Sequence, residues 1–456
     1  MITDMTEGSP AKSLWAFSIP LLLSAVFQQL YNIADSVIAG QFINKDALAA
    51  VGASYPITMI FMAIATGANV GCAVIISQLF GAKKYTDMKT AISTSIISVG
   101  FLSVILTVLG MVFSKPLMEL LQTPSEIFKD SSLYLDIYIG GLAFLFLYNI
   151  CTGVFTALGD SRTPLILLIC SSVGNIFLDI VFVAAFKMGV GGVAWATFIA
   201  QGISSILALL ILLRKIRLIV TLEKHKLYSF QMLGKISVMA VPSILQQSFV
   251  SVGNLFIQGK VNAFGPDVIA GYSAAIKLNT FAITSFTTLA NGISSFTAQN
   301  IGAGKIDRVK RGYKSGLLMA ACVVLPFIML YYLFSGQMIN IFVKANETDV
   351  INVGISFLQI VSPFYIFVAI KLMTDGVLRG AGSAITFMVA TFSDLAIRVI
   401  MAFILVDSYG SNGIWMSWPV GWVISTSISC IFYFSGIWKR KTAKFVPGEI
   451  KAIKGK

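Results

Sequence analysis

Two aspartates stand inside long apolar stretches that contain no lysine or arginine. These residues are Asp35 and Asp179. An ionisable side chain within a bilayer costs about 2.5–3.5 kcal/mol on insertion scales, so each carboxylate needs a partner or a function. At 1.5 Å per helical residue, Asp35, Asp179 and Thr197 lie at one depth, roughly 10 Å below the outer surface. Asn175 precedes Asp179 by one helical turn, so both side chains share one helix face.

This combination of oxygen atoms is suited to a small cation. Two carboxylates, an amide and a hydroxyl offer the hard ligands that Na⁺ prefers, and two carboxylates that repel each other can instead take up a proton. A structural interpretation is also open, in which each aspartate accepts a hydrogen bond from a neighbouring Tyr or Asn. The pattern favours a site for H⁺ or Na⁺ formed by Asp35, Asn175, Asp179 and Thr197.

The elements that must position these residues are membrane-spanning helices. Of the 456 residues, 57% are hydrophobic and 12% are charged, and the mean hydropathy is +0.85. The charged share of a soluble protein is about twice as high. Apolar runs long enough to cross a bilayer predict an all-α polytopic membrane protein with twelve transmembrane helices. The runs begin near Leu14, Ala50, Ala91, Leu133, Leu165, Val190, Ile236, Val268, Ser315, Val350, Ala384 and Gly413.

The basic residues indicate the orientation of these helices. The net charge is +13, and most of the 33 Lys and Arg residues fall in the breaks that share the side of the N-terminus. The positive-inside rule therefore places both termini in the cytoplasm. The residues before the first run lack a signal-peptide pattern, so that run is expected to be a retained span. The basic tail is interpreted as a topology determinant at the lipid surface, which argues against nucleic-acid binding.

Residue types for enzymatic chemistry are scarce. The only histidine, His225, lies in a Lys-rich loop, which leaves none for a catalytic triad or a metal cluster. The five cysteines have no paired spacing, and the Gly-Lys breaks at 77–84 and 298–305 lack the spacing of a phosphate-binding loop. We therefore expect a protein that is not an enzyme, has no cofactor and does not use ATP.

The sequence repeats itself. Pro20 corresponds to Pro242, and residues 152–160 correspond to 375–383. A shift that moves the chain by six spans gives both halves the same orientation, which predicts two six-helix lobes related by a pseudo-twofold axis near the membrane normal. The expected organisation is a first lobe at 1–213, a cytoplasmic linker at 214–235, a second lobe at 236–438 and a basic cytoplasmic tail at 439–456.

Pro20 and Pro242 occupy corresponding places in the first helix of each half. A proline inside a helix removes one hydrogen bond and permits a kink. Proline-interrupted helices in matching positions point to a transport site, and Pro20 shares its helix with Asp35. A static kink that serves packing is the alternative.

The second half carries several charges that can pair within one helix. Lys371, Asp375 and Arg379 follow one another in steps of four residues, and Asp394 precedes Arg398 by the same step. Side chains at this spacing are neighbours on a helix surface. We expect these charges to neutralise one another along their own helices.

Several motifs resemble the multidrug and toxic compound extrusion (MATE) family of secondary transporters over nearly the whole chain. They are IPLLLSAVFQQLYNIADSVIAGQF (19–42), the glycine-alanine turns at 81–82 and 302–303, TALGDSRTP (156–164), GNIFLDIVFV (174–183) and GGVAWATFIAQ (191–201). The resemblance implies twelve helices in two lobes and export of amphipathic, often cationic compounds in exchange for H⁺ or Na⁺. It also implies a monomer in the bacterial cytoplasmic membrane, with the lipid bilayer and small molecules as its partners.

The resemblance is closest to the DinF-like branch of that family. In this branch the cation site of the first lobe uses an Asp fifteen residues after a helix-bending Pro, an Asn and an Asp one turn apart, and a Thr. Asp35 after Pro20, then Asn175, Asp179 and Thr197 match that pattern. The resemblance therefore assigns cation coupling to these four residues and bending to Pro20.

The NorM-like branch relies instead on an acidic residue in the seventh helix, where this chain has Gln246 and Gln247. This departure favours coupling through the first lobe, while Asp375 keeps a role for the second lobe open. Tyr138 and Asn149 are expected near the site. Export would alternate between inward-open and outward-open states.

A flippase for lipid-linked oligosaccharides, with a related two-lobed fold, is the alternative function. Such a protein needs basic residues in its cleft to bind pyrophosphate, and Lys260, Lys277, Lys371 and Arg398 are candidates. The acidic residues of the first half and twelve spans, in place of the fourteen that such flippases have, count against it.

Overall fold

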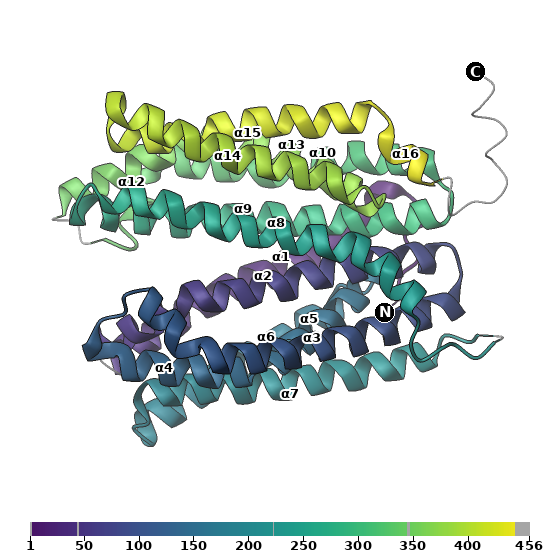
Figure 1. Cartoon of the computed structure of the whole chain (residues 1–456). Helices are drawn as coiled ribbons and strands as arrows, with labels where there is room; N and C mark the ends of the chain where they lie inside the picture. Colours follow the sequence, from purple (N-terminus) through teal and green to yellow (C-terminus); the bar gives the residue numbers. More distant parts are fainter. Residues whose placement is uncertain (1, 43–44, 222, 344–346, 443–456) are drawn as a thin grey trace. The chain divides into compact units, whose positions relative to one another are not determined.

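The computed structural model shows a helical protein (Figure 1). It describes residues 2–42, 45–221, 223–343 and 347–442, with the side chains of 32–42, 45–48 and 440–442 outside the description. Helices account for most of these residues, and the described ranges contain no strand. The all-α fold class predicted from the apolar runs is therefore confirmed.

The chain forms two compact units. The first contains the residues up to Thr3 and Leu23–Ile244, and the second contains Asp4–Leu22 and the residues from Leu245 onward. Two long helices, α1 (Pro10–Phe42) and α8 (Phe230–Asn262), begin in one unit and end in the other.

The change of unit falls directly after a proline in both helices. In α1 the boundary follows Leu22, and in α8 it follows Ile244, so each lies two residues beyond Pro20 or Pro242. The predicted lobe boundaries follow chain order, so they differ from these units over the first part of each helix. The difference arises because each helical turn belongs to the unit whose helices it packs against, which need not be the unit of its neighbours in sequence.

The first unit is built around α5, which packs against α2, α3 and α7. Its remaining helices are joined by short turns. Besides the second part of α1 and the first part of α8, the unit contains α2 (Lys45–Gly81), α3 (Tyr85–Leu120), α4 (Ser125–Gly140), α5 (Leu142–Ala157), α6 (Arg162–Asp179), the π-helix η1 (Ile180–Ala185) and α7 (Gly189–Arg217).

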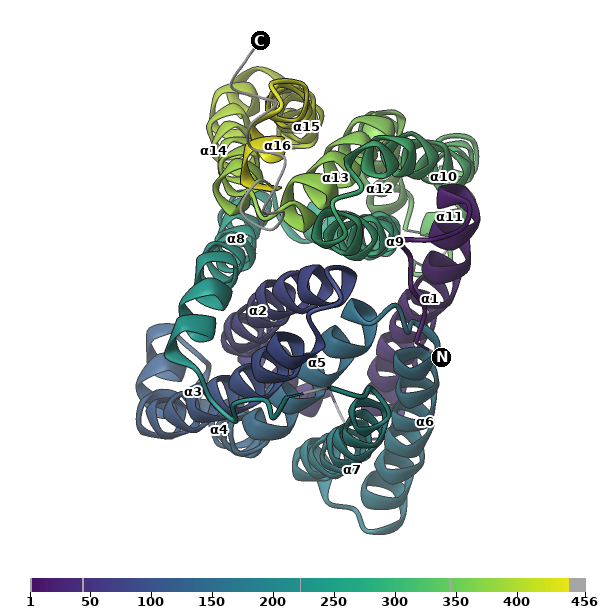
Figure 2. The ribbon, with the colours of Figure 1, turned by 90° about the vertical axis from the view of Figure 1, so that its right-hand side faces the viewer.

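The second unit has an aromatic core. Trp415 stacks on Tyr272 with ring centroids 5.0 Å apart, and Phe357 meets both rings edge-on. Figure 2 shows α14 beside α15 and α13 beside α9. The elements are α9 (Pro266–Gly302), α10 (Ile306–Leu333), α11 (Ser335–Ile339), α12 (Thr348–Val361), the 3-10 helix η2 (Ser362–Phe364), α13 (Tyr365–Gly380), α14 (Ala384–Tyr409), α15 (Ser411–Phe434) and α16 (Ile437–Thr442).

Ten helices of the described chain are long and apolar enough to cross a membrane, and α4 with α5, bent by 48°, forms an eleventh candidate. The bend explains why one apolar run yields two helices. The remaining predicted span, α9, has 37 residues but is rich in Ser, Thr and Asn, and its residues from Gly292 to Gly302 are all buried. Protein rather than lipid therefore covers that end of α9.

Two pairs of glycines mark equivalent turns in the two units. Gly159 and Gly382 have φ values of +74° and +81°, and Gly189 and Gly410 both have a φ of +59°. Each glycine stands at or just before the start of a corresponding helix, and glycine occupies this left-handed region without the penalty that a side chain imposes. The internal repeat of the sequence is thus repeated in the backbone.

The N-terminal segment is folded against the second unit. The backbone N–H of Met5 donates to Gln299 Oε1 at 2.9 Å, and Arg308 Nη2 donates to the Met5 carbonyl at 3.1 Å. Met5 is fully buried. These contacts explain why residues before the first span belong to the second unit.

Candidate functional site

Asn175 connects three of the residues that the sequence singled out. In the amide orientation that satisfies both of its ends, Nδ2 donates to Asp179 Oδ2 at 2.9 Å, and Oδ1 accepts from the Thr197 backbone N–H at 3.1 Å. Asp179 is fully buried, and Asn175 is nearly so. Helices α6 and α7 thus bring Asn175, Asp179 and Thr197 together.

Tyr31 of α1 completes the contacts of this amide. Its Oη lies 2.7 Å from Nδ2 of Asn175 and accepts a hydrogen bond from it. Tyr31 was not predicted as a site residue, although it precedes Asp35 by one helical turn. Asp35 belongs to α1, but its side chain lies outside the described residues.

A cavity of about 350 Å³ in the first unit is lined by Asn175 and Thr197. Tyr138 and Asn149, which were expected near the site, also line it. Five tyrosines and two methionines give the wall an aromatic and polarisable character; they are Tyr31, Tyr55, Tyr134, Tyr138, Tyr148, Met59 and Met62. Tyrosine and methionine side chains carry no fixed charge, and their hydroxyls and thioethers can contact an amphipathic molecule.

The helix changes its pitch directly after Asp179. Helix α6 ends at this residue, and the π-helix η1 continues the same span to Ala185. Insertions of this type are frequent at functional sites because they redirect side chains and leave backbone groups less tightly bonded. The pattern of apolar residues gave no signal for this change.

Asp160 lies in the turn between α5 and α6, at the opposite end of α6 from Asp179. Its carboxylate forms an ion pair with Lys215 of α7 and accepts hydrogen bonds from the Thr163 backbone N–H at 3.1 Å and from Thr163 Oγ1 at 2.8 Å. Burial opposes ionisation, but the hydrogen bonds from Lys215 and Thr163 outweigh it and hold the pKa of Asp160 below its usual range. This charged cluster fixes the start of α6 against the end of α7.

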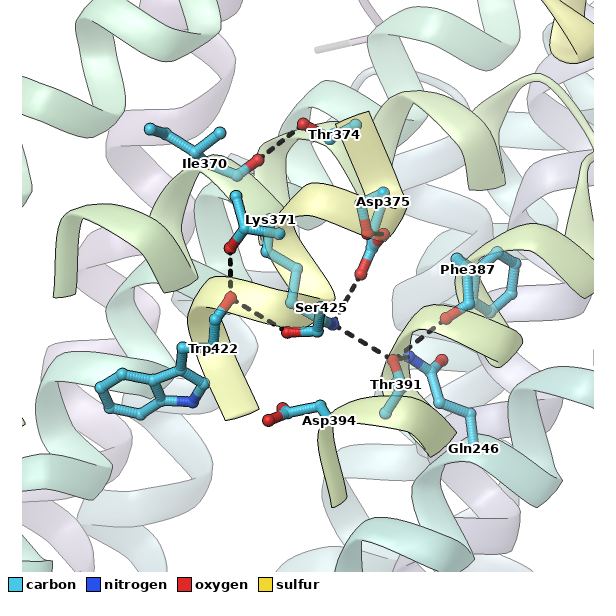
Figure 3. Close-up of polar contacts among 12 residues, drawn as sticks. Gln246, Ile370, Lys371, Thr374, Asp375, Phe387, Thr391, Asp394, Trp422 and Ser425 are labelled. Carbon is cyan, nitrogen blue, oxygen red and sulfur yellow. Dashed lines mark hydrogen bonds and ion pairs between the residues drawn. The ribbon is translucent and has the colours of Figure 1, made fainter. Parts of the chain in front are cut away.

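Asp375 in the second unit is paired with a lysine of its own helix (Figure 3). Lys371 Nζ lies 2.8 Å from Asp375 Oδ2, and Ser429 Oγ donates to Oδ1 at 2.6 Å. Lys371 also donates to Thr391 Oγ1 at 3.2 Å, and Gln246 Nε2 donates to the same hydroxyl at 2.7 Å. The pairing predicted from the four-residue step is confirmed, and Gln246 joins its network.

The other charges of α13 and α14 give a mixed result. Arg398 Nη2 lies 3.0 Å from Asp394 Oδ2, as the spacing predicts. Arg379 instead donates to Asn291 Oδ1 at 2.8 Å and to Ser294 Oγ at 3.3 Å, both on α9. The expectation that Arg379 pairs along its own helix was wrong, because its guanidinium turns to acceptors on α9.

Comparison with known protein families gives a match to one family in both halves of the chain. The MatE family model matches once in each half, over residues 20–181 and 242–404. Both matches begin at the prolines that the internal repeat places in correspondence.

Two proteins of Bacillus subtilis (strain 168) are similar over nearly their full length. Probable multidrug resistance protein YpnP is 26% identical over 445 residues, which cover 96% of this chain and 97% of that protein. Probable multidrug resistance protein YoeA is 27% identical over 452 residues, with the same coverage.

Two solved structures share the fold. One is described as the outward-facing conformation of a multidrug resistance MATE family transporter of the MOP superfamily, with a TM-score of 0.89 and 22% identity over 97% of this chain and 98% of that chain. A MOP superfamily transporter from Pyrococcus furiosus, for which a binding pocket of reverse polarity is described, gives a TM-score of 0.88 and 22% identity over 96% and 98% of the two chains.

Proposed function

The chain belongs to the MatE family, and on this premise we propose that it exports amphipathic, often cationic small molecules in exchange for H⁺ or Na⁺. Its full-length similarity to proteins named as multidrug resistance proteins supports this function. The observation that carries the proposal is the contact of Asn175 with the buried Asp179 and with Thr197, where Asn175 and Thr197 line a tyrosine-rich cavity.

The driving cation would bind at Asp35 and Asp179, with Asn175 and Thr197 as neutral ligands. The Asn175 amide presents its donor end to Asp179, so it satisfies the carboxylate with a hydrogen bond while no cation is bound. An arriving Na⁺ needs the amide oxygen, and an arriving proton turns one carboxylate oxygen into a donor and weakens the other as an acceptor. Either cation therefore weakens the contact of Asn175 with Asp179 and disturbs its contact with Tyr31.

Tyr31 connects the binding of the cation to α1. The same amide nitrogen contacts Tyr31, which stands eleven residues beyond Pro20 on the helix that also carries Asp35. Pro20 lies next to the point where α1 changes from one compact unit to the other. Cation binding would bend or straighten α1 at Pro20 and so shift the transporter between its outward-open and inward-open states.

The cavity supports a substrate of the proposed kind. Its volume lies within the range of about 300–1,000 Å³ that is usual for small-molecule sites. Tyrosine rings such as Tyr138 and Tyr148 attract organic cations through their π faces, and Met59 and Met62 adapt to varied shapes. Asn149 would orient polar groups of the substrate.

Two of the four basic residues that the flippase alternative requires are not accessible. A pyrophosphate needs accessible cations, whereas Lys371 and Arg398 are buried and paired with aspartates. Lys277 is exposed and Lys260 is half-buried, and each lies over an aromatic ring: Nζ is 5.5 Å from the ring centroid of Phe342 for Lys277 and 3.8 Å from that of Phe403 for Lys260. We therefore favour drug export over lipid flipping, with coupling in the first lobe and a DinF-like site.

The remaining features of the proposal follow the sequence. The protein would be a monomer in the bacterial cytoplasmic membrane with both termini in the cytoplasm, because its basic residues gather in the breaks on that side. The lobes would follow the repeat, at 1–213 and 236–438, with the linker and the basic tail cytoplasmic. Catalysis and a resident cofactor are not part of this function.

Efflux from liposomes tests the proposal. Purified protein is reconstituted with ethidium inside, and a pH gradient and a Na⁺ gradient are imposed separately. Antiport predicts efflux that one gradient drives and that Asp35→Asn abolishes while the variant stays folded. Absence of efflux under both gradients, with folded wild-type protein, would contradict the proposal and favour lipid flipping.

A further inference from the structure

The glycines of the two units give a residue-by-residue correspondence between α6 and α14. Gly159 precedes α6 and Gly382 precedes α14, and the two differ by 223 residues (159 to 382). Both helices then run without interruption past their sixteenth residue. The same shift moves Asn175 onto Arg398.

A second pair of glycines relates α7 to α15. Gly189 is the first residue of α7 and Gly410 directly precedes α15, a difference of 221 residues (189 to 410). This shift moves Thr197 onto Trp418. The shift decreases from 223 to 221 residues between α6 and α7, where the first unit contains the π-helix η1.

The corresponding residues make corresponding contacts. In the first unit the Asn175 amide contacts Thr197 across α6 and α7. In the second unit the guanidinium of Arg398 lies over the ring of Trp418 across α14 and α15, with 4.2 Å between Cζ and the ring centroid. The same place in the two units thus holds a neutral amide in one and a permanent cation in the other.

The surroundings of Arg398 hold that cation in place. Asp394 Oδ2 lies 3.0 Å from Nη2, and both side chains are more than nine-tenths buried. Asp394 Oδ1 and Arg398 Nε have no hydrogen-bond partner within the part of the chain that the structure describes. A Cβ on Gly421 would lie 2.6 Å from Asp394 Oδ1, so glycine at this position of α15 leaves room for the pair.

We propose that Arg398 is a tethered cation that stands, in the second unit, at the place of Asn175, the amide that would ligate the exchangeable cation in the first. The inference rests on the proposed function and extends it. A guanidinium stays protonated at any physiological pH and cannot leave the site. The charge of this place in the second unit therefore remains constant through the transport cycle, and only the first unit exchanges its cation.

A buried ion pair that serves packing alone would behave differently after removal of the arginine. In Arg398→Gln the carboxylate of Asp394 stays buried without its cation, which is strongly unfavourable. If the place is a cation site, a small cation from solution will restore the balance of charge. If it serves packing alone, the variant will be destabilised to the same extent in every salt.

Thermal unfolding of the full chain in detergent separates these cases. The background is Asp179→Asn, which removes the proposed exchangeable site, and NaCl replaces choline chloride at constant ionic strength. We expect no Na⁺-dependent rise of Tm in Asp179→Asn and a clear rise when Arg398→Gln is added, because a cation that binds only the folded state stabilises it. Arg398→Lys in the same background retains the charge and should show no rise.

Two outcomes would overturn the inference. One is an equal Tm in both salts for Asp179→Asn with Arg398→Gln. The other is a Na⁺-dependent rise that persists when Asp394→Asn is added to that variant, since the carboxylate is the ligand. Neither result depends on drug transport, so failure of the export function would be seen separately in the efflux experiment.

A second measurement holds even if Arg398→Gln does not fold. Asp394→Asn combined with Arg398→Gln removes both charges, and such neutral replacements of buried pairs are often tolerated. The number of cations exchanged per drug molecule should keep its wild-type value in this variant, whatever its rate. A changed ratio would show that the pair itself exchanges a cation and would overturn the inference.

Discussion

The side-chain amide of Asn175 donates to the carboxylate of Asp179 over 2.9 Å, one helical turn further along the same helix. In the second unit, an ammonium group donates to a buried carboxylate at 2.8 Å, from Lys371 to Asp375. When a mobile cation displaces a neutral amide from a carboxylate, the amide is left without an unpaired charge. A displaced lysine would keep its positive charge and would need another partner. The two units thus suit different tasks.

Asn175 should be required for coupling because its amide is both the donor to Asp179 and the contact to Tyr31. Asn175→Ala leaves the carboxylate without this hydrogen bond, and Asn175→Gln moves the amide by one methylene group. Both variants should lower gradient-driven ethidium efflux in liposomes at least tenfold. The control is Asn262→Ala at the exposed end of α8, whose side chain bonds only to Gln258 among the described contacts. Equal losses in Asn175→Ala and Asn262→Ala would argue against the assignment.

The ion pair of Lys371 with Asp375 should contribute to stability, and removing both charges should be less harmful than removing the lysine alone. Lys371→Met leaves Asp375 buried without its cation, and loss of one partner of a buried pair costs about 3–5 kcal/mol. Adding Asp375→Asn removes the unpaired charge and should recover most of that loss in thermal unfolding. If the double variant is as unstable as the single one, the packing of Lys371, and not its charge, is what matters.

Close helix packing in the second unit depends on Gly380. A Cβ at this position of α13 would lie 2.3 Å from the Ser294 carbonyl oxygen of α9, so the helices must separate. Gly380→Ala should destabilise the protein by about 1–3 kcal/mol, the range for overpacking. Gly259→Ala in α8 is the matched control, since its Cβ meets nothing within 4 Å. It should be neutral or stabilising, because alanine favours helix more than glycine does.

Stability should depend on pH through Asp160. Because hydrogen bonds from Lys215 and Thr163 hold its pKa below that of the unfolded chain, the ionised group stabilises the fold at any pH above the unfolded value of about 3.9. This contribution is lost as the pH falls through the folded pKa. Asp160→Asn should therefore lower Tm at neutral pH, and the gap to wild type should shrink below about pH 4. A gap that stays constant would show that the charge is not the cause.

Much of the fold could be predicted from the sequence because the decisive signals are local. Apolar runs locate the helices, and the four-residue spacing places Asn175 beside Asp179 and Lys371 beside Asp375. Contacts between distant segments give no such signal. Met5 bonds to Gln299, and Arg379 turns to Asn291 on another helix. These partners depend on which acceptors the neighbouring helices leave available.

The cavity illustrates the same limit. Asn175 and Thr197, which depth and spacing singled out, line it, as do Tyr138 and Asn149, which were expected as neighbours of the site. The role of Tyr31 was missed because a tyrosine in an apolar run is usually part of the core. Only the folded α1 and α6 show its hydroxyl 2.7 Å from the Asn175 amide.

Whether the exchangeable cation binds in the first unit is tested by comparing the two buried carboxylate sites in one assay. Ethidium efflux is measured in liposomes under the gradient that drives the wild type, with Asp179→Asn on one side and the neutralised pair Lys371→Met with Asp375→Asn on the other. We expect Asp179→Asn to lose gradient-driven efflux while folded, and the neutralised pair to retain it. Full coupling in Asp179→Asn, with loss in the neutralised pair, would instead place the exchangeable cation in the second unit.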